Sequence, residues 1–165
     1  MSELDPVYEI RSAQTKEDFQ QAARLFRAYA DWLQIDLCYQ NFEQELATLP
    51  KMYGEKQGKL LLAWVENTVA GCVGVRQFGE SVGEMKRLYV PAKFQGKGIG
   101  KALARQIIQE AKKLGYTEMV LDTLEQMKAA RKLYHALGFQ ETSAYYANPL
   151  PEVIYLKLDL FDNKI

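Results

Sequence analysis

The chain has 165 residues, 48% of them hydrophobic, and its 21 basic and 21 acidic side chains leave a formal net charge of zero. This length suits one domain with a single buried core, spanning residues 1–165. The charge balance argues against a general nucleic-acid binder, and no apolar run is long enough to cross a membrane. The polar, acidic N-terminus lacks the pattern of a signal peptide, so we expect a cytoplasmic protein.

Up to residue 90 the pattern predicts a strand, two helices and three further strands. Residues 6–13 are strand-like, and apolar residues spaced three and four apart predict an amphipathic helix over residues 19–33. A shorter helix over residues 42–49 is expected to stop at Pro50, before a polar loop. Three apolar, β-rich runs separated by short turns then predict an antiparallel meander, at residues 59–66, 68–78 and 81–90.

The second half of the chain alternates helices and strands. A helix is expected from about residue 98 to 114, followed by a strand at 117–123 whose lack of polar alternation favours a central, buried position. A second amphipathic helix covers residues 126–137. Two final strands are expected at residues 139–146 and 152–160. This order predicts an α/β fold built on one mixed sheet.

Cysteine and histidine are scarce, which limits the chemistry. Cys38 and Cys72 are the two cysteines and neither belongs to a CxxC motif, so we expect buried free thiols. His135 is the single histidine, which excludes a zinc site built from histidines and any two-histidine mechanism. We therefore expect no metal.

The segment "QGKGIGKALARQ" lies between a strand and a helix and predicts an anion site. Its glycines allow close backbone approach and positive φ, and the first N–H groups of the helix point outward at the positive end of the helix dipole. Between Lys86 and Arg105 there are six basic residues and no acidic one. Phosphate is the typical ligand of such a helix start. The alternative is a solvated basic helix start with a glycine loop.

Two common phosphate motifs do not fit this segment. A Walker A loop requires Ser or Thr after Gly100-Lys101, where this chain has Ala102. A dinucleotide fingerprint follows its strand directly and begins a parallel βαβ unit, whereas "PAKF" intervenes here and the preceding strands are antiparallel. A nucleotide-binding protein is therefore disfavoured.

A third motif fits. "QGKGIG" matches the pattern Q/R-x-x-G-x-G/A, "EMKRLYV" precedes it, "AARKLYHALGF" follows, and the order of elements agrees over residues 7–160. On these grounds the chain resembles the GNAT superfamily of acetyl-CoA-dependent N-acetyltransferases, and its last part, "YYANPLPEVIYLKLDL", resembles small bacterial members. The resemblance implies a mixed, mostly antiparallel central sheet with splayed central strands and helices on both faces.

The resemblance also implies where acetyl-CoA, the co-substrate, binds. The pantetheine arm would pair with the backbone of Leu88, Tyr89 and Val90, as in β-augmentation. Many members carry Asn where this chain has Met127, so that contact is either lost or supplied by another group such as Thr123. The remaining implied contacts are at the pyrophosphate, from the amides of Gln95, Gly96, Lys97, Gly98, Ile99 and Gly100, with Lys101 and Ala102 beside it.

Two residues are candidates for catalysis. Tyr134 matches the tyrosine that the resemblance assigns as general acid to the departing thiolate, and a phenol is protonated at neutral pH. Its alternative role is in the core, because it lies on an apolar helical stripe. Glu84, on the strand where several members carry a base, is the candidate general base. The alternatives for Glu84 are a structural ion pair with Lys86 or Arg87, or replacement of its role by a chain of waters.

Aromatic residues are the candidates for the acceptor site, because aromatic faces attract ammonium groups. Trp32 is one, with Tyr29, Tyr39 and Phe42 in the same region of the first two helices. Tyr145 and Tyr146 would point to opposite faces of a strand, so one of them is expected to line the pocket.

The resulting hypothesis is an N-acetyltransferase that moves an acetyl group from acetyl-CoA to a primary amine by direct attack on the thioester. The acceptor is a small-molecule or peptide amine of unspecified identity, and the chain is expected to be a monomer or homodimer without nucleic-acid or membrane partners. The main alternative is a CoA-binding sensor or regulatory module without turnover.

Overall fold

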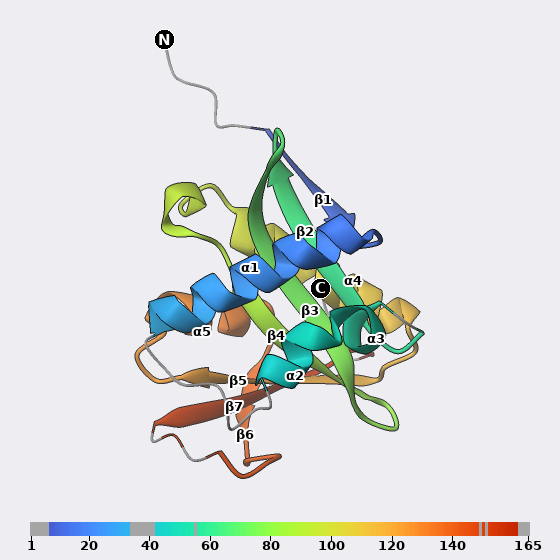
Figure 1. The fold of residues 1–165 in the computed structure, drawn as a ribbon. Helices are drawn as coiled ribbons and strands as arrows, with labels where there is room; N and C mark the ends of the chain where they lie inside the picture. Colours follow the sequence, from blue (N-terminus) through green and yellow to red (C-terminus); the bar gives the residue numbers. More distant parts are fainter. Residues whose placement is uncertain (1–6, 34–41, 55, 149, 151, 162–165) are drawn as a thin grey trace.

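The computed structural model describes residues 7–33, 42–54, 56–148, 150 and 152–161. These residues form one seven-stranded sheet with strand order β1-β2-β3-β4-β5-β7-β6 (Figure 1). Only the β4–β5 pair is parallel, so the sheet is mixed and mostly antiparallel. The strands are β1 (Tyr8–Ser12), β2 (Lys59–Val65), β3 (Thr68–Gly79), β4 (Val82–Tyr89), β5 (Glu118–Leu124), β6 (Gln140–Thr142) and β7 (Val153–Asp159).

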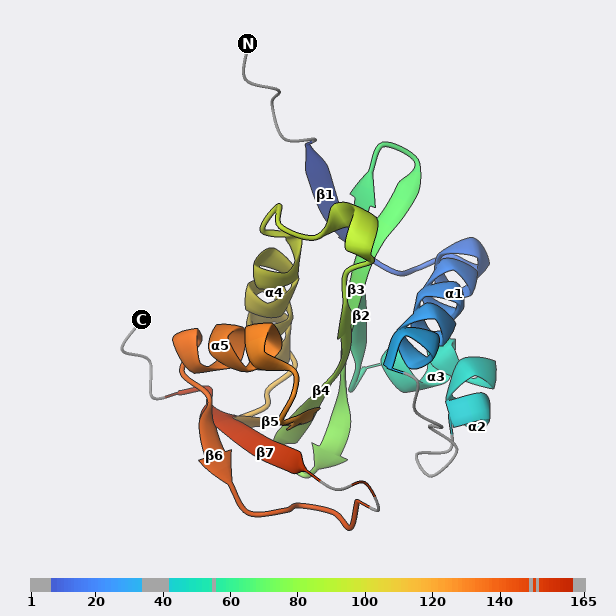
Figure 2. The same cartoon turned by 90° about the vertical axis from the view of Figure 1, so that its left-hand side faces the viewer.

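Helices cover both faces of the sheet (Figure 2). One face carries α1 (Lys16–Leu33), α2 (Phe42–Ala47) and α3 (Leu49–Tyr53), and the other carries α4 (Ile99–Lys113) and α5 (Lys128–Ala136). Each layer has its own apolar cluster, because the sheet separates them. None of the helices in the described part of the chain is long and apolar enough to cross a membrane.

The sheet opens at its centre, between β4 and β5. These strands pair only through Val82, Gly83 and Glu84, opposite Glu118, Met119 and Val120. Beyond Glu84, β4 continues along β3, whereas β5 continues along β7 to Leu124. The two central strands are therefore splayed, as the family resemblance implied, and their carboxyl halves do not pair with each other.

Two predicted boundaries were wrong. Pro50 does not stop a helix but lies in the first turn of α3, where its missing N–H has no helical partner to lose. The strand predicted over residues 139–146 ends at Thr142. Tyr145 and Tyr146 follow in a bend, so the strand alternation that would have placed them on opposite faces does not apply.

Candidate active site

The glycine-rich segment forms a tight turn into α4. Gly96 and Gly98 have φ of 81° and 80°, in the left-handed region that favours glycine. A Cβ on either residue would meet no atom within 4 Å, so the surface above both glycines is open. Glycine is therefore favoured at these positions by the positive φ and not by lack of space. Gln95 closes the turn by donating its side-chain N–H to the Val90 carbonyl at 2.8 Å. The helix begins at Ile99, so its first N–H groups face this open surface.

A cleft occupies the opening between β4 and β5. Among the residues predicted to bind the co-substrate or catalyse, Leu88, Thr123 and Tyr134 line it, and so does Met127. Tyr29 and Leu33 of α1 form the opposite wall, which extends the cleft to the α1 side of the sheet. The structure therefore brings Leu88, Thr123 and Tyr134 to one cavity, while the glycine turn lies on the connection from β4 to α4.

The side chains around the end of β4 are aromatic. The ring of Tyr89 lies 5.4 Å from Tyr29 and 6.1 Å from Trp32, and Trp32 stacks on Tyr29 at 6.3 Å. Trp32 remains 51% exposed, so it can meet a ligand that enters from this side. Tyr39, another candidate for the acceptor site, lies outside the described residues, as does Cys38, whereas Phe42 is buried against Arg87.

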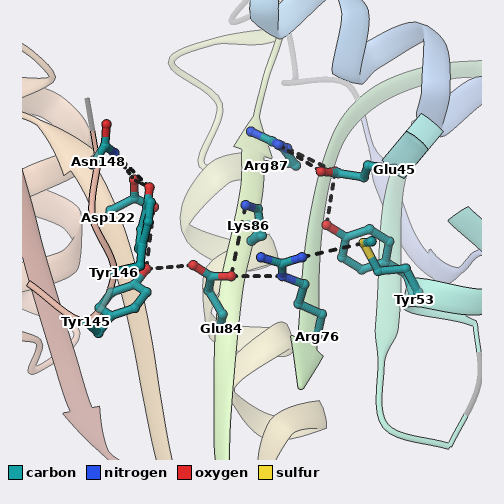
Figure 3. Close-up of polar contacts among 11 residues, drawn as sticks. Glu45, Tyr53, Arg76, Glu84, Lys86, Arg87, Asp122, Tyr145, Tyr146 and Asn148 are labelled. Atoms are coloured by element: carbon teal, nitrogen blue, oxygen red, sulfur yellow. Dashed lines mark hydrogen bonds and ion pairs between the residues drawn. The ribbon is translucent and has the colours of Figure 1, made fainter. Parts of the chain in front are cut away.

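Strand β4 carries a bulge before the cleft. In the β3–β4 register Cys72 faces Tyr89 and Gly74 faces Lys86, so β4 has one extra residue, and Arg87 has a φ of 61°. The Arg87 guanidinium binds Glu45 of α2 through two hydrogen bonds, and Tyr53 donates its hydroxyl to the same carboxylate (Figure 3). Burial raises the pKa of Glu45, but the hydrogen bond and charge of Arg87 outweigh it and lower the pKa.

Glu84 is buried, with 1% of its surface exposed, and is not an ordinary surface carboxylate. Its Oε1 lies 2.9 Å from Arg76 Nε and 4.0 Å from Lys86 Nζ, and its Oε2 accepts a 2.7 Å hydrogen bond from the Tyr145 hydroxyl. The sequence offered a structural ion pair with Lys86 or Arg87 as the alternative role of Glu84. The main cationic partner of Glu84 is instead Arg76. Glu84 is not among the residues that line the cleft.

Asp122 is a second carboxylate in this region, and the sequence interpretation missed it. It lies on β5 and lines the cleft. Its Oδ2 accepts hydrogen bonds from the Tyr146 hydroxyl at 2.6 Å and from Asn148 Nδ2 at 3.3 Å, and the Tyr145 hydroxyl lies 3.5 Å from Oδ1. The available signal was an acidic residue inside the apolar run "TEMVLDTL".

Tyr134 projects from α5 into the same cleft. It is buried and its ring packs edge-on against Phe139 at 5.8 Å, so it contributes to the core as well as to the cavity wall. Burial raises the pKa of Tyr134 well above its usual range, and the Tyr29 phenol and the Asp122 carboxylate raise it further. The hydroxyl therefore stays protonated and can donate a hydrogen bond.

Lys86 also lines the cleft, with its side chain almost wholly buried. Burial lowers the pKa of Lys86 to about 8, and the positive charge of Arg87 adds to this effect. The cleft therefore contains basic, acidic and phenolic groups in a partly desolvated setting, which is typical of a catalytic site.

The sheet opens beside a glycine turn and a helix start, and a buried phenol lies on the cavity wall. This arrangement suits an extended ligand that bears phosphate groups. Comparison with known proteins agrees. The family model described as Acetyltransferase (GNAT) family matches residues 19–139. An uncharacterized N-acetyltransferase of Schizosaccharomyces pombe is 40% identical over 153 residues, which cover 92% of this chain and 94% of that protein. The chain therefore belongs to the GNAT family and is an acetyltransferase of the kind that uses acetyl-CoA.

Solved structures share the fold. An acetyltransferase from Streptococcus agalactiae has a TM-score of 0.77 and 18% identity, and the match covers 92% of this chain and 98% of that chain. The PaiA N-acetyltransferase from Thermoplasma acidophilum, solved in complex with coenzyme A, has a TM-score of 0.74 and 20% identity, over 93% of this chain and 99% of that chain.

Proposed function

We propose that the chain transfers an acetyl group from acetyl-CoA to a primary amine by direct attack of the amine on the thioester. The observation that carries this proposal is the cleft between the splayed strands β4 and β5, with the Tyr134 phenol on its wall. The acceptor class includes small molecules and peptides with a free amino group.

The donor end of the site suits coenzyme A. The open surface above Gly96 and Gly98 and the helix start at Ile99 offer N–H groups to a pyrophosphate. The proposed partners there are Gln95, Gly96, Lys97, Gly98, Ile99 and Gly100, with Lys101 and Ala102 beside them. Backbone groups of Leu88, Tyr89 and Val90 suit the pantetheine arm, and Thr123 lies on the facing strand.

Acetyl transfer requires that a neutral amine attack the carbonyl carbon, that the C–S bond break, and that a thiolate leave. The Tyr134 hydroxyl is proposed to donate to this thiolate as its negative charge develops, so that the product leaves as a thiol. A base must take the proton that the amine loses, either a carboxylate or a chain of waters. Glu84 is one candidate for this base. It is buried, and the hydroxyl of Tyr145 lies between it and Asp122, which lines the cleft.

A panel of primary amines incubated with acetyl-CoA, with free thiol release followed over time, tests the proposal. Thiol release that depends on an amine, with the acetylated amine detected by mass spectrometry, is the expected result. Binding of acetyl-CoA without amine-dependent release would favour a CoA-binding sensor. Binding of ATP in preference to acetyl-CoA would favour the nucleotide-binding alternative.

A further inference from the structure

Two carboxylates flank the point where the central strands separate. Glu84 is the last residue of β4 paired with β5, opposite Val120. Asp122 lies two residues farther along β5, so its side chain shares a sheet face with Val120 and Glu84. The neighbours Met85 and Leu121 belong to the apolar cluster under α4 and α5. The two carboxylates therefore face the opposite side, where α1 to α3 lie, while the glycine turn leads into α4.

The two carboxylates differ in their partners. Glu84 pairs with Arg76, and Glu45 elsewhere on this face pairs with Arg87. Within the described part of the chain, the hydrogen bonds of Asp122 come from neutral groups alone: Tyr145, Tyr146 and Asn148. A partly buried carboxylate normally has a cationic partner, because desolvated charge is costly.

The oxygen atoms of Asp122 also differ. Oδ2 already accepts two hydrogen bonds, at 2.6 Å and 3.3 Å, whereas Oδ1 has one contact at 3.5 Å, to the Tyr145 hydroxyl. The two hydrogen bonds to Oδ2 fix the orientation of the Asp122 carboxylate. Asn148 also donates its side-chain N–H to the Tyr146 hydroxyl at 2.7 Å. Oδ1 thus keeps most of its capacity to accept a hydrogen bond, on a residue that lines the cleft.

We propose that Asp122 is the catalytic carboxylate of the acceptor site: it binds the ammonium form of the amine substrate and takes one of its protons. The proposal rests on the acetyl transfer proposed above and specifies its acceptor as an amine that binds as a cation. Glu84 is then a positioning residue, which holds Tyr145, and with it the bend that carries Tyr146 and Asn148, against Asp122.

The proton balance is complete. The ammonium group, R–NH₃⁺, gives one proton to Asp122 and becomes a nucleophilic amine. Attack on the thioester carbon forms the C–N bond and expels the thiolate as the C–S bond breaks. The Tyr134 hydroxyl gives its proton to the thiolate. The nitrogen then loses a second proton, which restores the proton on the Tyr134 hydroxyl. The products are an amide, a thiol and one proton, which Asp122 returns to solvent.

Other ionisable groups surround Asp122 and contribute to any pH profile. From the neighbouring strands, the cleft wall and the bend, these groups are Arg76, Lys86, Arg87, Glu84, Tyr29, Tyr134, Tyr145, Tyr146 and Tyr155. The assignment to Asp122 therefore needs a comparison of variants and not the profile of the native protein alone.

The test compares Asp122→Asn with Glu84→Gln, using the best amine of the panel and a fluorinated, less basic analogue of it. For Asp122→Asn we expect kcat to fall about 10²–10⁴-fold and the KM for the amine to rise, with the KM for acetyl-CoA unchanged. The loss should shrink with the less basic amine or at high pH, because more of the acceptor is then already neutral. Glu84→Gln should show a smaller loss that neither change repairs.

The controls separate the possible failures. Asp122→Glu keeps the charge and should retain part of the activity, and it serves as the second variant if Asp122→Asn does not fold. Two results would overturn this inference while leaving acetyl transfer intact. One is native-like amine kinetics in Asp122→Asn. The other is activity that the less basic amine restores in Glu84→Gln but not in Asp122→Asn. Absence of acetyl-CoA binding and of thiol release in the native protein would overturn the proposed function itself.

Discussion

Arg87 and Glu45 form a buried, two-point ion pair between the bulge of β4 and the helix α2. Arg87 Nη2 lies 2.8 Å from Glu45 Oε1, and Nε lies 3.1 Å from Oε2. A bulge with a left-handed arginine is strained, at a cost of order 1–2 kcal/mol for a residue with a Cβ. The pair fixes this bulge, and Cys72 also contacts it through the Arg87 carbonyl at 3.2 Å.

Removing one charge of this pair should be costly. Glu45→Gln leaves the Arg87 guanidinium buried without its carboxylate, so we expect the free energy of unfolding to fall by about 3–5 kcal/mol. The matched control is Glu43→Gln on the same helix, whose partner Arg27 has a side chain 56% exposed; that change should cost about 0–1 kcal/mol. Urea unfolding measures both variants. Equal losses would contradict a special role for the buried pair.

The same pair should make the free energy of unfolding fall as the pH becomes acidic. Because the pKa of Glu45 is lower in the folded protein than in the unfolded chain, its contribution is complete above the unfolded value and is lost as pH falls through the folded value. Unfolding measured from neutral pH downward should show a steeper acid loss in the native protein than in Glu45→Gln. Parallel curves would contradict this assignment.

Local signals in the sequence predicted much of the fold. Glycine spacing and apolar periodicity predicted the turn at Gly96 and Gly98 and the start of α4 to within a residue. The meander was also confirmed, because each of its turns joins neighbouring strands. The Glu84–Tyr145 contact was not predictable in this way, since its partners are 61 residues apart. Asp122 and Asn148, 26 residues apart, are brought together by the pairing of β5 with β7, which Asn148 precedes in the chain.

Acetyl-CoA should stabilise the folded chain through the glycine turn. At about 100 times its dissociation constant it should add roughly 2.7 kcal/mol and raise Tm by roughly 5–11 °C. Gly98→Asp should abolish this shift, because it places a negative charge at the anion site and a side chain at a φ of 80°. Gly100→Ala is the control, since its added Cβ would meet Val90 at 3.6 Å, an ordinary contact. A shift of equal size with ATP alone would contradict the specificity for coenzyme A.

Tyr134→Phe tests the hydroxyl without opening the core. The ring packing against Phe139 is retained, so stability should change little, whereas kcat should fall by about 10²–10⁴ if the hydroxyl donates to the thiolate. The KM for acetyl-CoA should stay the same. The pKa of Tyr134 is raised in the native protein, so its hydroxyl should not ionise near the usual tyrosine pKa of about 10. Activity should therefore not fall at that pH because of Tyr134. An unchanged kcat would leave Tyr134 with a structural role alone.

Lys86 should make stability increase with pH over a defined window. Its pKa is lowered from 10.5 to about 8 in the folded protein, because burial disfavours the ammonium form and the charge of Arg87 adds to this. Between these two values the unfolded chain binds more protons than the folded one, so the free energy of unfolding rises with pH. The full effect is about 3 kcal/mol, and about half of it is expected between pH 8 and 9.5.

Lys86→Met keeps an unbranched side chain of similar length and removes the titrating group. The variant should be more stable than the native protein at pH 7, because it no longer holds a disfavoured charge in the cleft, and the difference should shrink as pH rises through 8. Guanidinium unfolding at intervals from pH 7 to 9.5 measures the two curves. Tyrosines also titrate near the upper end, so the difference between the curves is the readout. A constant difference would show that the burial of Lys86 does not shift its protonation.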